Sequence, residues 1–115
     1  MIKTEFGIID DFQPNQKYTT YEPEKYHCVA IDDDEYIDDW WERLLMIRTY
    51  NMSLEQPQWA LSRGGITLIP PESLPALLEI IAKDNRIYWD DSLVELADLV
   101  RQAITENKYM IHYGV

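Results

Sequence analysis

Residues 32–42 combine seven carboxylates with two adjacent tryptophans in a run of eleven residues. Placed on a helical wheel, the acidic side chains of this run lie on one side and the apolar side chains lie on the other. The acidic side holds Glu35, Asp38, Asp39 and Glu42, and the apolar side holds Ile37, Trp40, Trp41, Leu44 and Ile47. We therefore predict an amphipathic helix from about residue 34 to residue 50, with its apolar side against a core.

The acidic charge of this helix exceeds what the helix itself needs. The carboxylate of Asp33 or Asp34 is expected to accept from free backbone N–H groups at the helix start, where the dipole also favours negative charge. Like charges four residues apart, such as Glu35 with Asp39, repel each other by roughly 0.2–0.5 kcal/mol per pair. The remaining carboxylates are therefore candidates for a binding role or for a solvated face.

Size and charge exclude several classes of function. A chain of 115 residues with 46% hydrophobic residues fits one domain with a real core, and four Trp, eight Tyr and two Phe must line a core or an interface. Twenty-one acids against ten bases give a net charge of −11. This charge argues against binding to nucleic acid or to an anionic membrane surface, both of which need clustered Lys and Arg. A basic partner protein remains compatible with it.

The chain has the features of a cytoplasmic protein. Cys28 is the only cysteine, so no internal disulfide can form, and a reducing compartment is the simpler assumption. The N-terminal residues lack a secretory hydrophobic run, and no segment approaches the roughly 18 apolar residues of a membrane span.

Four segments have β-prone composition. They are residues 5–12, 26–31, 66–69 and 108–113. The polar stretch 13–24 is predicted to be an irregular loop, and residues 51–63 are predicted to be a connection.

Two further helices are predicted in the second half. One begins at Pro71 or Glu72, since proline costs little at the first helical position. After a short link at residues 85–89, the other covers residues 92–106, with Ser92 as the N-terminal residue of a capping box. The expected fold is a single α+β domain over residues 1–115, with a three- or four-stranded sheet packed with about three helices.

No metal or cofactor is predicted. A calcium loop that began at Asp32 would need glycine at its sixth position and glutamate at its twelfth, where this chain has Ile37 and Arg43. Mg²⁺ needs only one or two carboxylates plus a phosphate ligand, so a weak divalent site stays open without being predicted.

Structural roles explain the candidate nucleophiles. Neighbouring side chains on a strand point to opposite faces, so His27 cannot readily activate Cys28, and His112 could do so only if their strands pair. Cys28 is therefore expected to be a buried small hydrophobe. The pair Gly64-Gly65 precedes a strand, whereas phosphate-binding glycine loops follow one, so it is expected to form a turn.

The adjacent tryptophans favour a protein-binding surface. Two large rings side by side on a helix cannot both point into one core stripe, and a partly exposed tryptophan beside carboxylates suits the recognition of a basic partner. We predict a partner-binding surface made of Asp34, Glu35, Asp38, Asp39, Trp41 and Glu42. The most concrete version is a bacterial immunity protein or toxin inhibitor, an expectation based on size and charge.

Two alternatives remain. The first is a homo-oligomeric structural or scaffold protein, with a self-interface made of Trp59, Trp89, Tyr109 and Tyr113. The second is an enzyme, which would need acids, or His27 and His112, to converge in a cleft. Nothing in the spacing of these residues brings them together, so no catalytic residues are predicted.

Overall fold

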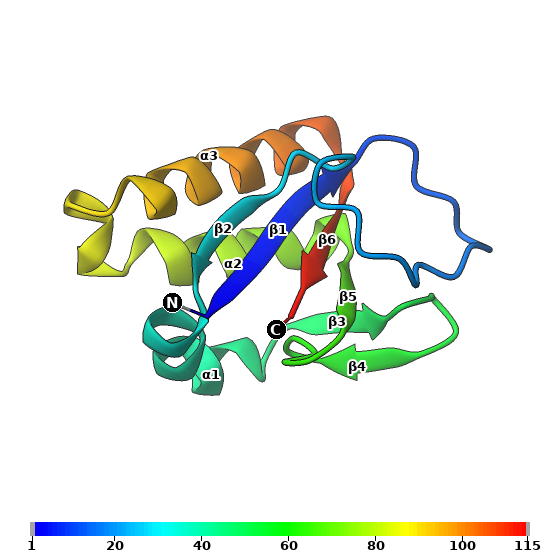
Figure 1. Cartoon of the computed structure of the whole chain (residues 1–115), viewed down its shortest axis with the longest axis horizontal. Helices are drawn as coiled ribbons and strands as arrows, with labels where there is room; N and C mark the ends of the chain where they lie inside the picture. The colour runs from blue at the N-terminus through cyan, green and yellow to red at the C-terminus, as the bar shows by residue number, and fades with distance from the viewer. Residues whose placement is uncertain (1, 115) are drawn as a thin grey trace.

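A computed structural model describes residues 2–114, and within that range six strands form one antiparallel sheet (Figure 1). The strands are β1 (Lys3–Ile9), β2 (Val29–Asp32), β3 (Arg48–Asn51), β4 (Pro57–Trp59), β5 (Ile66–Ile69) and β6 (Tyr109–Tyr113). Their order across the sheet is β2-β1-β6-β5-β3-β4. Three α-helices complete the architecture: α1 (Asp38–Leu44), α2 (Leu74–Ala82) and α3 (Asp91–Glu106). The predicted α+β class is confirmed, but the predicted sheet of three or four strands is too small.

The two extra strands are β3 and β4. We expected Arg48–Tyr50 to end the acidic helix and residues 51–63 to be a connection, but α1 ends at Leu44 and the chain turns into a hairpin. The buried hydroxyl of Thr49 donates a hydrogen bond to the carbonyl of Ala60 at 2.6 Å, and β3 also pairs with β5. These strands are only four and three residues long, and β3 is held between β4 and β5, so they carry almost no local pattern.

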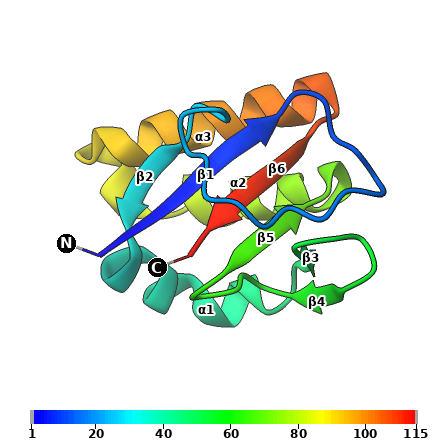
Figure 2. The same cartoon turned by 45° about the vertical axis from the view of Figure 1, so that its right-hand side comes forward.

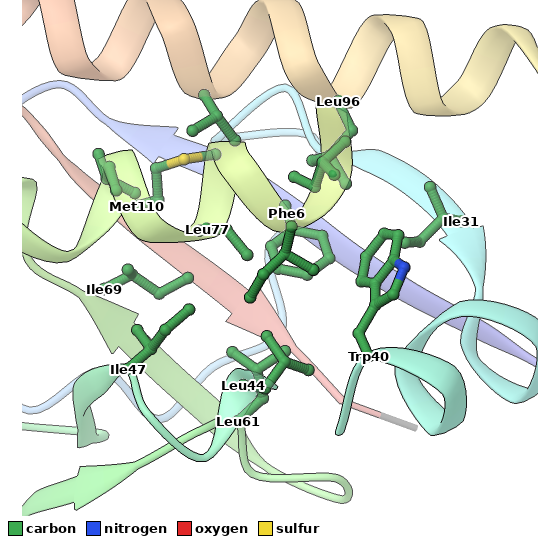
Figure 3. Packing of buried hydrophobic residues seen from close by; sticks show 14 of the residues in the cluster. Phe6, Ile31, Trp40, Leu44, Ile47, Leu61, Ile69, Leu77, Leu96 and Met110 are labelled. Atoms are coloured by element: carbon green, nitrogen blue, oxygen red, sulfur yellow. The ribbon is translucent and has the colours of Figure 1, made fainter. Parts of the chain in front are cut away.

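One face of the sheet is covered by α2 and α3. Aliphatic side chains dominate this core, in which Phe6, Leu77, Leu96 and Met110 are buried between the helices and the strands (Figure 3). Alternation along β6 follows the period of two expected for a strand. Met110 belongs to this core, while Ile111 belongs to the core on the opposite face.

The opposite face is covered by an irregular segment, residues 10–28, which runs across the front of the sheet in Figure 2. This second core is mainly aromatic: the ring of Phe12 stacks on Tyr109 with centroids 3.7 Å apart, and Tyr18 and Tyr26 are buried beside Ile111. The hydroxyl of Tyr113 donates to the carbonyl of Thr20 at 3.1 Å. The stretch 13–24 is irregular, as predicted, and it forms a packed layer over the sheet.

The helices of the second half agree closely with expectation, apart from their caps. The observed α3 begins one residue before the predicted residue 92 and ends at the predicted residue 106. Its N-cap is Asp90, whose Oδ1 accepts from the backbone N–H of Ser92 at 2.9 Å, so Ser92 is not the cap. A 3₁₀ turn at Pro71–Ser73 leads into α2, and the predicted link contains a second 3₁₀ turn, η3 (Asn85–Tyr88). None of the helices among residues 2–114 is long and apolar enough to cross a membrane.

Candidate functional site

The predicted acidic helix consists of a π-helical turn, η1 (Asp33–Ile37), that continues into α1. Its apolar side faces the core, where Tyr36, Ile37, Trp40 and Leu44 are at most 2% exposed. The five predicted acidic partner-binding residues, Asp34, Glu35, Asp38, Asp39 and Glu42, are all exposed. The predicted division into an acidic side and an apolar side is therefore present, although the helix is shorter than expected.

The cap of this segment is not the one that we predicted. Asp32 occupies the N-cap position, and its Oδ1 accepts from the backbone N–H of Glu35 at 3.2 Å. Asp33 is instead turned inward, with its side chain only 4% exposed. Like any buried charge, the Asp33 carboxylate requires a partner.

Arg63, from the connection between β4 and β5, supplies that partner. Its Nη2 donates to the Asp33 carboxylate at 2.5 Å, and its Nη1 lies 2.6 Å from the Asp38 carboxylate. The guanidinium also lies over the ring of Trp41, 5.3 Å from the centroid. One arginine thus pairs with two acids of the segment and lies over Trp41, which is half-buried.

Arg86, from η3, holds the other side of the segment. Its Nη2 lies 2.7 Å from the Asp84 carboxylate, and its Nη1 lies 3.1 Å from the Asp39 carboxylate. The guanidinium also lies over the ring of Tyr36, 4.5 Å from the centroid. The indole Nε1 of Trp40 donates to Asp84 at 2.8 Å. The connection between α2 and α3 is therefore tied to both η1 and α1.

The ionisation of this inner network follows from its hydrogen bonds. Hydrogen bonds from Arg86, supported by one from Trp40, lower the pKa of Asp84 to about 2 against the effect of burial. The same pairing raises the pKa of Arg86. Burial, together with a hydrogen bond donated to Asp90, raises the pKa of the Tyr36 hydroxyl. Both charges of the Asp84–Arg86 pair are therefore held across the physiological pH range.

This geometry divides the predicted site residues into two groups. Asp38 and Asp39 are engaged by Arg63 and Arg86, whereas Asp34, Glu35 and Glu42 form no ion pair with any residue of the described chain. Sequence reasoning missed both arginines, which are 25 and 47 positions from Asp38 and Asp39 respectively. No local pattern signals such pairs.

Trp41 is half-buried, in keeping with the partly exposed tryptophan that we expected beside the carboxylates. Its ring packs against the aliphatic core and carries the Arg63 guanidinium. Two more strongly exposed aromatic residues are Tyr88 and Trp89, at 84% and 71% exposure, two and three positions after Arg86 in the chain. They had no helical pattern that would have distinguished them in the sequence.

The self-interface proposed from the aromatic residues is not one surface. Trp59 is 56% exposed, but it lies on the edge strand β4, whereas Trp89 lies between η3 and α3. Tyr109 is half-buried under Phe12, and Tyr113 is buried under the segment 10–28. These four residues therefore do not form a common exposed patch.

Cys28 and His112 lie apart. Cys28 is half-buried against the aromatic core, and burial raises the pKa of its thiol to about 12. His112 lies on the helix-covered face next to Phe6, hydrogen-bonded to the Oγ1 of Thr4, and burial lowers the pKa of its imidazole to about 3. Strand β1 separates β2 from β6, so the strand pairing that a Cys28–His112 dyad would need is absent from the sheet.

Among residues 2–114, no three His, Cys, Asp or Glu side chains converge in an arrangement that could hold a metal ion. The free carboxylates of the acidic segment point to solvent, so the chemistry that this surface offers is the attraction of cationic groups. No protein-family model, curated protein or solved structure matches this chain.

Proposed function

We propose that this protein is a small acidic binding module that docks a basic partner protein through η1 and α1. The observation that carries the proposal is the group of three exposed carboxylates, Asp34, Glu35 and Glu42, which are left without internal ion pairs on a segment whose other acids are held by arginines. The narrower form of the proposal is an inhibitor or immunity protein that covers the cationic site of a toxin.

Rigidity supports this proposal. Arg63 and Arg86 join the segment to the β4–β5 connection and to η3, and Trp40 is fully buried beneath it. Carboxylates on a fixed backbone lose less conformational entropy on binding than the same groups on a mobile loop. The backbone that carries the outer acids is therefore held in place by contacts with the rest of the fold.

Electrostatics also supports it. Residues 1–43 carry twelve acids and four bases, so 8 of the 11 net negative charges lie in the first third of the chain. An excess of negative charge of this kind steers a cationic partner during diffusion and raises the association rate by about 10- to 1,000-fold, most strongly at low salt.

The test compares two double charge reversals. The variant Glu35→Lys with Glu42→Lys changes the proposed surface, and Glu24→Lys with Glu55→Lys makes the same change of charge at exposed positions in the 10–28 segment and in the β3–β4 hairpin. Each protein is immobilised and exposed to nuclease-treated extract of its source cells, and the bound proteins are eluted with rising salt. The association rate of the purified partner is then measured at several salt concentrations.

We expect the first variant to associate at least about tenfold more slowly at low salt and to lose most of the salt dependence, with the control close to the unmodified protein. Equal rates for the two variants would refute the assignment of the surface. If no basic protein is retained in a stoichiometric amount, the proposal itself fails. The narrower form further requires that an equimolar amount of this protein suppress the activity of the partner.

A further inference from the structure

A second exposed surface lies where α1 ends, around Met46. Met46 is 80% exposed, and it forms a shallow hollow together with Leu45 and Trp59, which are 47% and 56% exposed. A neighbouring hollow of about 320 Å³ shares Met46 and is lined also by Arg43, Ile47, Ala76, Glu79, Ile80 and Lys83. We call the residues of these two hollows the Met46 surface.

The charge of the Met46 surface differs from that of the rest of the chain. Two bases, Arg43 and Lys83, and one acid, Glu79, are among the residues that line the neighbouring hollow. A third base, Arg48, lies over the ring of Trp59, with its guanidinium 5.0 Å from the centroid. In a chain with a net charge of −11, this is a surface at which bases outnumber acids. A second copy of the same chain therefore meets less repulsion here than at the acidic segment.

The Met46 surface is also complementary to itself. It carries a protruding apolar side chain, Met46, next to a hollow with Ile47 and Ile80 in its lining, and that lining carries both signs of charge. In a two-fold interface every contact occurs twice with the roles exchanged, so protrusion, hollow, base and acid must all lie on one patch. We propose that two copies of this protein associate through the Met46 surface, with Met46 of each copy inserted into the hollow of the other.

We expect this interface to be formed by side-chain contacts, and not by the pairing of β4 with a strand of the second copy. The backbone N–H of Ala60 donates to the carbonyl of Ile47 at 2.9 Å, and the register pairs Trp59 with Arg48. The alternation of an antiparallel ladder then directs the N–H and C=O of Trp59 to the free edge. Two positions earlier, Pro57 has no N–H to donate, which limits the pairing of β4 with a further strand.

This inference does not depend on the basic partner. The Met46 surface lies at the C-terminal end of α1, next to Glu42 of the partner-binding surface, whereas Asp34 and Glu35 lie in the preceding turn η1. Self-association is measured on the purified protein alone. Its outcome is therefore separate from that of the partner experiment.

The test is sedimentation equilibrium of the unmodified protein and of two variants. Met46→Glu places a charge in the apolar hollow, and Tyr88→Glu adds the same charge at a residue that is 84% exposed on another part of the surface. Both side chains lie outside the core, and circular dichroism checks that the variants are folded.

We expect the mass of the unmodified protein and of Tyr88→Glu to rise from 13.6 kDa toward twice that value with concentration. Met46→Glu is expected to weaken the association at least about 30-fold, the effect of losing a central contact. A mass that stays at 13.6 kDa for the unmodified protein up to about 1 mM would overturn the inference. So would a Met46→Glu variant that associates as well as the unmodified protein.

Discussion

Two kinds of carboxylate surround the acidic segment. Asp33 and Asp84 are nearly buried, at 4% and 9% side-chain exposure, and each is held by an arginine at 2.5 Å and 2.7 Å respectively. Glu35 and Glu42 are exposed, and neither forms an ion pair within the described chain. The difference shows that carboxylates in one region of the chain have different roles. The inner carboxylates hold the segment in place, and the outer ones are free to act on another molecule.

The two tryptophans of the segment repeat this contrast. Trp40 is fully buried and donates to Asp84, whereas Trp41 is half-buried under the Arg63 guanidinium. Trp40→Ala is expected to lower the free energy of unfolding by about 3–5 kcal/mol, because it empties a core site. Trp41→Ala should lower the free energy of unfolding by a clearly smaller amount. Urea denaturation of both variants measures the difference, and equal losses would break the comparison.

The next largest effect is expected for Asp84→Asn. The pKa of Asp84, lowered to about 2, lies below the ordinary carboxyl value, so its stabilisation is present above about pH 4 and is lost as the pH falls through about 2. Removing the charge should lower the free energy of unfolding by about 2 kcal/mol at pH 7. Denaturation curves at several pH values should show the unmodified protein and the variant converging between about pH 4 and pH 2. A difference that does not change with pH would contradict the ionic origin.

A smaller effect is expected for Arg63→Met. This substitution leaves the buried Asp33 carboxylate without its partner. Because Arg63 is partly accessible to solvent, we expect the free energy of unfolding to fall by about 1 kcal/mol, near the lower end of the range for an unpaired buried polar group. Arg101→Met is the matched control, because Arg101 pairs with Asp98 on an exposed face of α3 and should change stability by less than about 0.5 kcal/mol. Chemical denaturation of both variants compares the two pairs. Equal losses would show that the Asp33 pair does not contribute more than a surface pair.

The smallest effect on stability is expected for the outer acids. Glu35→Lys with Glu42→Lys should change the free energy of unfolding by no more than about 0.5 kcal/mol, because both side chains are exposed and the substitutions relieve repulsion between like charges. Thermal denaturation alongside Glu24→Lys with Glu55→Lys gives the measurement. A loss well above that of this control would show that the outer acids, like the inner ones, stabilise the fold.

Regular elements could be predicted where the pattern repeats within one segment. The stripe of α3 and the β-prone run of β5 identified those elements almost to the residue, and the wheel of residues 34–47 separated exposed acids from buried apolar residues correctly. The hairpin β3–β4 was missed because its strands are short, and because β3 is stabilised by pairing with β5 and by the Thr49 hydrogen bond. Such contacts leave no periodic signal.

The site was predictable only in part, for the same reason. The five acids of the predicted surface are exposed, but the sequence could not reveal that Arg63 engages Asp38 and that Arg86 engages Asp39. Trp41 was included in the predicted surface because of its neighbours in the chain. In the structure Arg63, from the connection between β4 and β5, lies over its ring. Contacts between distant segments decide which member of a charged run remains free.

By itself the sequence determined the α+β class, the amphipathic character of the acidic segment, the strong negative charge and the lack of an internal disulfide. These follow from composition and from the spacing of neighbouring residues, because helices and strands repeat at fixed periods. The tertiary structure decided the six-stranded sheet, the aromatic layer of residues 10–28, the division of the carboxylates, and the exposure of Met46. Those features depend on which segments meet in space, and that is set by the packing of the whole chain.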